Sequence, residues 1–181
     1  MNVFLSLGSN LGDRFELLRA AVRALRRMHD VHVVTASAIY ETEPWESEPG
    51  LLRDEQRWYL NCVVQIETSL PAEILLERLK RLETDLGRSR APGTPEAQRF
   101  AARTLDADIL FYGQRVISAP DDLHIPHLLL HERAFVLRPL ADVAPELEHP
   151  TLYRTVRELL EELGDDHEVR PSGLPRRWFE D

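Results

Sequence analysis

The amino-acid sequence predicts an α+β protein with the ferredoxin-like order β-α-β-β-α-β, in which an antiparallel sheet carries two helices on one face. Three observations lead to this expectation. Apolar segments of strand length recur along the chain, two longer segments have apolar residues three and four positions apart, and turn residues separate them. A sheet of this kind leaves its second face open for ligands or for added elements.

The chain begins with an expected strand at residues 3–7, where aliphatic residues alternate with other types. Residues 8–12 follow as a turn. This turn also resembles a phosphate-binding loop, but it has no lysine and matches no dinucleotide fingerprint, so we interpret it as a turn before a helix cap. Asp13, with Glu16 three residues later, predicts an N-cap and a capping box. The helix that follows has an apolar face formed by Phe15, Leu18, Val22 and Leu25.

Two strands, a helix and a fourth strand are expected next. Residues 31–40 and 58–68 are strand-like, and a polar loop joins them. Pro71 opens a second helix with leucines at spacings of four, three and four, and Gly87 fits the position after its C-terminal cap. Residues 104–112 form the fourth strand.

Additional helices are expected in the C-terminal part of the chain. One follows Pro126, and another at residues 156–163 is stopped by Gly164. We expect residues 1–164 to form a single domain, and residues 165–181 to form a polar and flexible C-terminal tail.

The alternation of side chains along two strands places polar residues on the open face of the sheet. In the third strand the apolar residues share one face, whereas Tyr59 and Asn61 share the other. In the fourth strand Asp106 and Asp108 point the same way. The opposite face of that strand is expected to carry Ala107, Ile109 and Phe111. If the apolar sets face the two helices, one site on the open face could use all four polar residues.

Composition limits the classes of function. With 43% hydrophobic and 29% charged residues, the 181-residue chain has an ordinary globular composition. Its net charge of -9 argues against nucleic acid or an anionic membrane surface as the main partner. Cys62 is the single cysteine, which excludes an internal disulfide and favours a reducing cytoplasm. Composition therefore favours small, locally anionic ligands in the cytoplasm over nucleic-acid or membrane partners, and we also expect a monomer.

Arginines cluster directly before the two aspartates. Within 16 residues the chain carries Arg88, Arg90, Arg99 and Arg103. Guanidinium groups bind phosphates through paired hydrogen bonds, and carboxylates two residues apart on a strand can bind hard cations together. This combination predicts a site for polyphosphate and magnesium. The alternatives are a solvated strand face and a solubilising loop, which leave the clustering unexplained.

Histidines form a second possible constellation. His127 and His131 are four residues apart, and His124 precedes them, which invites a zinc interpretation. Zinc usually requires at least three protein ligands, and the pattern is not HExxH. We interpret His127 instead as a phosphate contact or as part of a helix start.

Six motifs run in order along residues 2–149, namely LSLGSNLGDR, YETEPW, YLNCVVQIET, LGRSR, RTLDADILFYG and LHIPHLLLHERAFVLRPLADVAPE. Together they closely resemble the bacterial 6-hydroxymethyl-7,8-dihydropterin pyrophosphokinase family. The resemblance implies transfer of a whole diphosphate from ATP to the pterin hydroxymethyl group with release of AMP, in folate biosynthesis. It also implies two magnesium ions.

The resemblance assigns a role to each candidate site residue by its position. Asp106 and Asp108 would hold the metals, and together with Arg88 and Arg90 they form the expected catalytic set. ATP would be bound by Glu83, Arg88, Arg90, Arg103, Ile109, His127 and Arg133. The pterin would be bound by Thr42, Pro44, Trp45, Tyr59, Asn61 and Phe135.

Three alternative functions remain open at this point. A kinase that transfers only the γ-phosphoryl group would use the same chemistry. A non-enzymatic RNA-binding module would require a basic, aromatic sheet face, whereas this one carries aspartates. A homologue that binds pterin without turnover is favoured by Phe100 and Asp122, which stand where the family has Trp and Arg.

Overall fold

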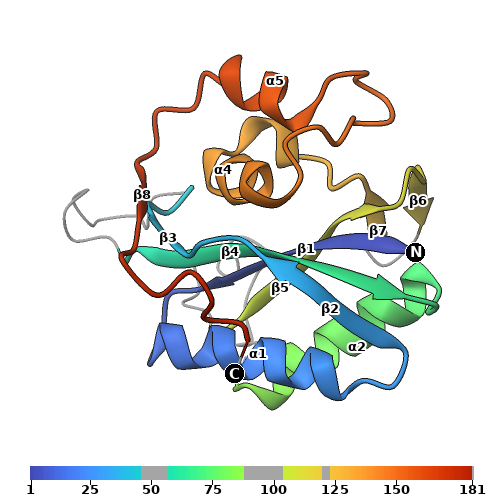
Figure 1. Cartoon of the computed structure of the whole chain (residues 1–181), viewed down its shortest axis with the longest axis vertical. Coiled ribbons are helices and arrows are strands. Elements are labelled where there is room, and N and C mark those ends of the chain that lie inside the picture. Colours follow the sequence, from blue (N-terminus) through green and yellow to red (C-terminus); the bar gives the residue numbers. More distant parts are fainter. Residues whose placement is uncertain (46–56, 88–103, 120–122, 181) are drawn as a thin grey trace, which may run out of the picture.

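An antiparallel sheet lies at the centre of the molecule, with helices packed on both of its faces (Figure 1). The structure is a computed structural model of the chain and describes residues 1–45, 57–87, 104–119 and 123–180. Within these residues the sheet has six strands in the order β5-β1-β4-β3-β8, and β2 also pairs with β4. The strands are β1 (Asn2–Ser9), β2 (Val31–Ala36), β3 (Tyr40–Thr42), β4 (Tyr59–Thr68), β5 (Asp106–Tyr112) and β8 (Val169–Pro171).

Helices α1 and α2 cover one face of the sheet, whereas α4 and α5 lie over the other (Figure 1). The helices are α1 (Arg14–Arg27), α2 (Ala72–Asp85), α4 (Ala134–Val143) and α5 (Val156–Glu161). A short hairpin of β6 (Ile117–Ala119) and β7 (Leu123–Ile125) and the 3-10 helix η2 (Leu130–Glu132) lead into α4. The ferredoxin-like α+β class with additional C-terminal helices is confirmed. None of the helices in the described ranges is long and apolar enough to cross a membrane.

The ends of α1 and α2 agree with the sequence signals. The Asp13 carboxylate accepts a hydrogen bond from the backbone N–H of Glu16 at 3.0 Å. The Glu16 side chain forms ion pairs with arginines of the following turns, so the helix has the predicted cap without the full box. Pro71 precedes α2, and Gly87 ends it with a φ of +89°, a conformation that favours glycine.

The strand predicted at residues 31–40 is in fact two strands. β2 and β3 both pair with β4 and are separated at Ser37. The Ser37 hydroxyl accepts a hydrogen bond from the Val63 N–H at 2.9 Å, and the Ser37 N–H donates to the Val63 carbonyl at 2.9 Å. The side chain therefore takes the place of a backbone acceptor, and the ladder is interrupted at this residue.

A β-bulge in β5 overturns the predicted orientation of Phe111. Leu5 pairs with Ile109 and Phe4 with Phe111, so Leu110 is an extra residue on β5. Alternation holds for Asp106 to Leu110, but Phe111 then points to the same side as Leu110. Its ring packs edge-on against Phe4, with centroids 6.4 Å apart, in the core under α4 and α5.

The C-terminal segment carries a strand that the sequence analysis did not assign. β8 pairs with β3 at the edge of the sheet. Trp178 is 3% exposed, and its indole N–H donates to the Ser37 carbonyl at 2.9 Å. The segment thus joins the core on the α1 side of the sheet. The domain boundary at residue 164 and the flexibility of the tail stay predictions.

Candidate functional site

A small pocket of about 50 Å³ lies between the sheet and the start of α4. Ser6 and Gly8 of β1 form part of its floor, and Leu110 and Val136 supply apolar walls. The pocket brings together seven of the predicted site residues, which are Tyr59, Asn61, Asp106, Asp108, His127, Arg133 and Phe135. The expected convergence of the four polar residues from β4 and β5 is confirmed.

The two aspartates occupy the pocket side of β5. Asp106 lies opposite Gly8, and Asp108 lies opposite Ser6, in the antiparallel pairing of β5 with β1. Both neighbours have small side chains, which leaves the half-buried carboxylates accessible from the pocket. Two carboxylates on the same face of a strand, two residues apart, are a suitable donor set for hard cations.

Asn61 is held in one orientation beneath the pocket. It is 4% exposed, and its amide nitrogen Nδ2 donates to the hydroxyl of the fully buried Thr42 at 2.6 Å. A Cβ atom on Gly8 would lie 2.4 Å from Asn61 Oδ1, which is closer than atoms approach. Gly8 is therefore a site residue that the sequence analysis missed, because it was interpreted as part of a turn. A glycine inside a strand is the signal that could have identified it.

Arg133 and Phe135 line the pocket at the start of α4, and both contact a further ring, Trp45, which lies outside the pocket lining. The Arg133 guanidinium lies 5.7 Å from the centroid of the Trp45 ring and 5.6 Å from that of Phe135. Trp45 and Phe135 are tilted against each other with centroids 6.3 Å apart. On its other side Trp45 stacks on His167, at 4.9 Å and an interplanar angle of 30°. His167 was missed by the sequence analysis and supports Trp45 from the C-terminal segment.

His127 is a neutral hydrogen-bonding group. Its burial, and then the nearby positive charge of Arg133, lower its pKa to about 4, although Asp106 acts in the opposite direction. Its Nδ1 accepts a hydrogen bond from the Leu129 N–H at 3.3 Å. The neutral ring therefore carries its proton on Nε2, which can donate to an anion.

Two other predicted residues lie on the helix side of β5. Glu83 at the end of α2 is 6% exposed, and its carboxylate accepts a hydrogen bond from the Ala107 N–H at 2.9 Å. Ile109 is 4% exposed within the core against α1 and α2. Neither is among the described residues that line the pocket. Pro44 is half-buried between Thr42 and Trp45.

Several predicted residues fall outside the described ranges. These are Arg88, Arg90, Arg99 and Arg103 from the arginine cluster, together with Phe100 and Asp122. The three histidines of the zinc interpretation do not converge. His127 lines the pocket, His124 contacts Ser118, and His131 contacts Glu132.

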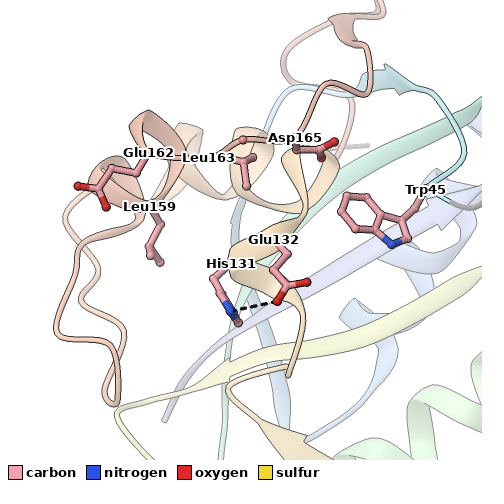
Figure 2. A pocket seen from close by; sticks show the side chains of 8 residues that line it. Trp45, His131, Glu132, Leu159, Glu162, Leu163 and Asp165 are labelled. Carbon is pink, nitrogen blue, oxygen red and sulfur yellow. Dashed lines mark ion pairs between the residues drawn. The ribbon is translucent and has the colours of Figure 1, made fainter.

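A second cavity of about 400 Å³ lies on the far side of Trp45, between α5 and the start of α4 (Figure 2). It is lined by Trp45, His131, Glu132, Leu159, Glu162, Leu163, Gly164 and Asp165. Although it is larger, it contains neither of the two aspartates of β5. The Asp165 carboxylate accepts hydrogen bonds from the Ala134 N–H at 2.7 Å and from the His167 N–H at 3.0 Å.

These contacts define Asp165 as an anchor for α4. Burial alone would raise its pKa, but the hydrogen bonds from Ala134 and His167 outweigh this effect and keep the pKa below the usual value.

The smaller pocket contains Asp106 and Asp108, together with Asn61, His127 and Arg133. We therefore take the smaller pocket as the candidate active site.

The fold and the pocket together define a class of protein. It is an α+β protein whose sheet presents two carboxylates and a buried amide to one pocket, with Arg133 and Phe135 lining it from the start of α4. Residues 4–145 match the family described as 7,8-dihydro-6-hydroxymethylpterin-pyrophosphokinase (HPPK). The chain belongs to this family.

Two bacterial relatives are similar to this chain over nearly their whole length. The 2-amino-4-hydroxy-6-hydroxymethyldihydropteridine pyrophosphokinase of Methylorubrum extorquens is 39% identical over 173 residues, which cover 96% of each chain. That of Haemophilus influenzae is 35% identical over 170 residues, covering 94% of this chain and 98% of the relative. The folic acid synthesis protein FOL1 of Dictyostelium discoideum is 36% identical over 93% of this chain, but this chain spans only 24% of FOL1.

A solved structure supports the fold. The HPPK-DHPS protein of Plasmodium falciparum superimposes with a TM-score of 0.65 over 89% of this chain and 44% of the Plasmodium chain. Its sequence identity is 17%, so this similarity concerns the fold alone.

Proposed function

We propose that this chain transfers a diphosphate group from ATP to the hydroxymethyl group of 6-hydroxymethyl-7,8-dihydropterin and releases AMP, as a step of folate biosynthesis. Membership of the HPPK family supports this reaction. The observation that carries the proposal is the convergence in one pocket of Asp106 and Asp108 with Tyr59, Asn61 and Phe135. The two aspartates can bind the metal ions that phosphate transfer needs. The two aromatic rings and the amide of Asn61 can bind a flat heterocycle.

Asp106 and Asp108 are proposed to bind two magnesium ions. Their carboxylates share one face of β5 and are accessible from the pocket, and oxygen ligands of this kind fit Mg²⁺. Magnesium usually takes its remaining ligands from water and from substrate phosphates, so two carboxylates from the protein are sufficient. When bound, the ions would neutralise charge on the phosphates.

The pterin is proposed to lie between the rings of Tyr59 and Phe135. One N–H of Asn61 Nδ2 donates to the Thr42 hydroxyl, which fixes the amide, and Asn61 Oδ1 is proposed to accept a hydrogen bond from the pterin edge. Small-molecule sites usually have volumes of roughly 300–1,000 Å³. The described pocket has about 50 Å³, so the site must widen when the substrate enters, and we propose that Arg133 and Phe135 then move away from the sheet. The backbone near Thr42, Pro44 and Trp45 is proposed to complete this part of the site.

ATP is proposed to contact the protein through its phosphates. His127 can donate from Nε2 without adding a charge, and Arg133 supplies a guanidinium group in the same pocket. The resemblance to the family supports further contacts from Glu83, Arg88, Arg90, Arg103 and Ile109, of which Arg88 and Arg90 would also be catalytic.

Catalysis then depends on position and charge. The pocket would hold the hydroxymethyl oxygen in line with the β-phosphorus of ATP, and the bond from the β-phosphorus to the AMP oxygen breaks as the new one forms. The arginines stabilise negative charge on the transferred group and on AMP. The hydroxyl proton is lost to Asp106 or to water. Because the transition state of phosphoryl transfer is loose, a strong base is not required.

The nucleotide product tests this proposal against the two enzyme-like alternatives. Purified protein with ATP, Mg²⁺ and 6-hydroxymethyl-7,8-dihydropterin should form one AMP for each pterin diphosphate, and EDTA should abolish the reaction. ADP as the product would identify an ordinary kinase. Binding of both substrates without any product would identify a protein that binds pterin without turnover. A cytoplasmic monomer without nucleic-acid or membrane partners is also proposed, and light scattering after gel filtration would test the monomer.

A further inference from the structure

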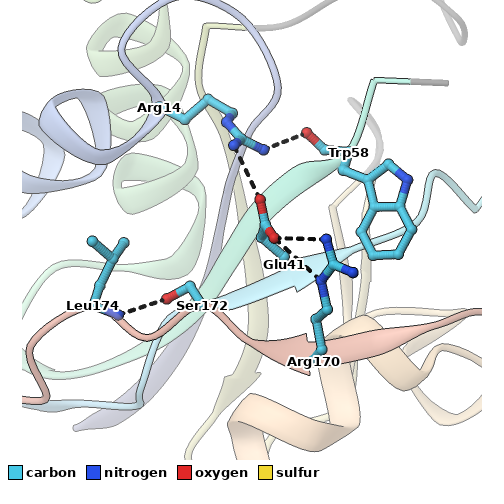
Figure 3. Close-up of polar contacts among 6 residues, drawn as sticks. All are labelled: Arg14, Glu41, Trp58, Arg170, Ser172 and Leu174. Carbon is cyan, nitrogen blue, oxygen red and sulfur yellow. Dashed lines mark hydrogen bonds and ion pairs between the residues drawn. The ribbon is translucent and has the colours of Figure 1, made fainter. Parts of the chain in front are cut away.

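Glu41 of β3 lies between two arginines on the helix side of the sheet, away from the pocket (Figure 3). Glu41 Oε1 is 3.2 Å from Arg14 Nη2 at the start of α1. Glu41 Oε2 accepts hydrogen bonds from Arg170 of β8, with Nε at 3.2 Å and Nη2 at 3.0 Å. Burial would raise the pKa of Glu41, but the hydrogen bonds from Arg170 and Arg14 outweigh it and lower the pKa. The carboxylate is therefore ionised at neutral pH.

Both arginines also contact Trp58, the residue immediately before β4. Arg14 Nη1 donates to the Trp58 carbonyl at 2.8 Å. The Arg170 guanidinium lies 4.4 Å from the centroid of the Trp58 ring (Figure 3). A guanidinium this close to an indole face is attracted by the ring. Glu41 thus sits at the centre of a cluster that joins the start of α1, β3, β8 and the start of β4, and we call Glu41, Arg14, Arg170 and Trp58 the clamp.

The clamp is adjacent in sequence and register to the residues proposed to bind the pterin. Thr42 pairs with Tyr59, and Glu41 pairs with Leu60, in the antiparallel ladder of β3 and β4. Side chains alternate along a strand, so Glu41 faces the helices whereas Thr42 and its partner Tyr59 face the other way. β3 and β8 contain only three residues each, so few backbone hydrogen bonds fix them within the sheet.

We propose that Glu41, together with Arg14 and Arg170, is a positioning residue for the pterin half of the active site. By holding β3 and Trp58 from the helix side, the clamp fixes the Thr42 hydroxyl beneath Asn61 and fixes the Tyr59 ring on the opposite face. This inference rests on the proposed function. It gives the C-terminal strand a role in substrate recognition, through Arg170, without any contact between that strand and the substrate.

A positioning role predicts a selective effect. The clamp side chains are partly exposed to solvent, at 27% for Glu41, 30% for Arg14 and 54% for Arg170. Ion pairs that water still reaches contribute modestly to global stability, so loss of the clamp should leave the protein folded. Displacement of a substrate-binding group by about 1 Å can nevertheless cost up to roughly 100-fold in rate. The effect should concern the pterin and spare ATP, because His127, Asp106 and Asp108 lie on other elements.

The test is Glu41→Gln, which keeps the size of the side chain and removes the charge that pairs with both arginines. We expect the KM for the pterin to rise about 10-fold or more, with the KM for ATP and the melting temperature almost unchanged. Glu168→Gln is the matched control, since Glu168 contacts the same Arg170 at 3.6 Å but lies outside the cluster centre. This control should behave as the wild type.

A double mutant tests whether the clamp acts as a unit. Arg170→Gln should show the same selective loss as Glu41→Gln, and the combination should be little worse than either single variant. A wild-type KM for the pterin in Glu41→Gln would overturn the inference. So would an equal loss of pterin binding, ATP binding and thermal stability, because that pattern indicates a structural role alone. If the wild-type protein neither binds nor converts the pterin, the proposed function fails first and this inference fails with it.

Discussion

Gly8 and Asn61 define the tightest contact in the candidate site. Because a methyl group on Gly8 would collide with Asn61 Oδ1, the glycine determines where the amide can lie. The amide in turn depends on Thr42, so three residues from three strands fix one hydrogen-bonding edge of the pocket. The position of the Asn61 amide therefore depends both on the space beside Gly8 and on the hydrogen bond to Thr42.

Gly8→Ala should therefore weaken pterin binding. The Asn61 side chain must turn away and lose its hydrogen bond to Thr42, with a cost of about 1–3 kcal/mol in binding, or roughly 5- to 150-fold in Kd. Calorimetric titration with the pterin would measure this change. Gly164→Ala is the control, because a Cβ atom there meets nothing within 4 Å. Unchanged pterin affinity in Gly8→Ala would contradict the proposed role of Asn61.

Asp108→Ala should abolish magnesium-dependent turnover and leave the fold intact. Removal of one of two carboxylates weakens metal binding where charge develops, and we expect a decrease in kcat of at least about 100-fold. AMP release and circular dichroism would be measured in parallel. Asp166→Ala removes an exposed carboxylate outside the pocket and should have wild-type activity. Full activity of Asp108→Ala would exclude the metal assignment.

His149 should make stability dependent on pH. Burial, and then the nearby His131, lower its pKa below the value of about 6.5 that histidine has in an unfolded chain. The unfolded state then binds more protons as the pH falls below about 6.5, so the free energy of unfolding decreases on acidification and is fully retained above that pH. Protonation of Nδ1 would also remove the acceptor for the Thr151 and Leu152 N–H groups.

Urea unfolding between pH 7.5 and pH 5 would measure this effect. His149→Asn keeps a hydrogen-bond acceptor but cannot titrate, so its stability should decrease less on acidification than that of the wild type. His29→Asn serves as the control, because the His29 side chain is 97% exposed. An equal pH dependence in wild type and His149→Asn would show that other groups are responsible.

At the scale of elements, the C-terminal segment is held by β8 and by Trp178. The Trp178 indole fills the core next to α1 and donates to the Ser37 carbonyl at the break between β2 and β3. One side chain thus secures both the end of the chain and an interruption of the sheet.

Trp178→Ala should decrease the free energy of unfolding by about 3–5 kcal/mol, since it removes a large, buried aromatic side chain. Trp178→Phe should cost less, because it keeps an aromatic ring and loses the hydrogen bond. Urea unfolding would measure both variants against Tyr153→Ala, a surface control at a residue that is 75% exposed. A cost below about 1 kcal/mol for Trp178→Ala would mean that the segment contributes little to the fold.

Local patterns in the sequence predicted the helices and main strands, because periodicity and caps are properties of neighbouring residues. The features that were missed depend on partners far along the chain. The strand break at Ser37 requires Val63, and the orientation of Phe111 follows from the pairing of Phe4 and Leu5 with β5. No local signal records these pairings.

The candidate site shows the same division. The alternation of side chains along a strand was sufficient to place Asp106 and Asp108 on one face of the sheet with Tyr59 and Asn61. It could not show that Gly8 supports Asn61, because that contact joins β1 and β4, which are separated in the chain by α1, β2 and β3. Nor could it show that Asp165 holds the start of α4, since the contact spans 31 residues.

At the scale of the whole molecule, the sheet separates two hydrophobic cores. One lies against α1 and α2, and the other lies under α4 and α5. Strands β1, β4 and β5 contribute side chains to both cores. Unfolding of the helices on one face would therefore expose the apolar side chains of the same strands that support the other core.

The protein should therefore unfold in a single cooperative transition, as expected for one domain. Tryptophan fluorescence and far-ultraviolet circular dichroism should give the same urea midpoint, and the calorimetric and van't Hoff enthalpies should agree. Two separate transitions would show that the layers fold independently and would contradict the single domain predicted for residues 1–164.

The end of the described chain lies beside α1, on the side of the sheet away from α4, and the buried Trp178 anchors it there (Figure 1). A label attached there would be held close to the protein body and would point away from the pocket. Coupling the molecule to a biosensor chip through this end should leave the pocket facing the flowing solution. Immobilisation through the C-terminus is thus the orientation of choice for following nucleotide and pterin arrival in real time.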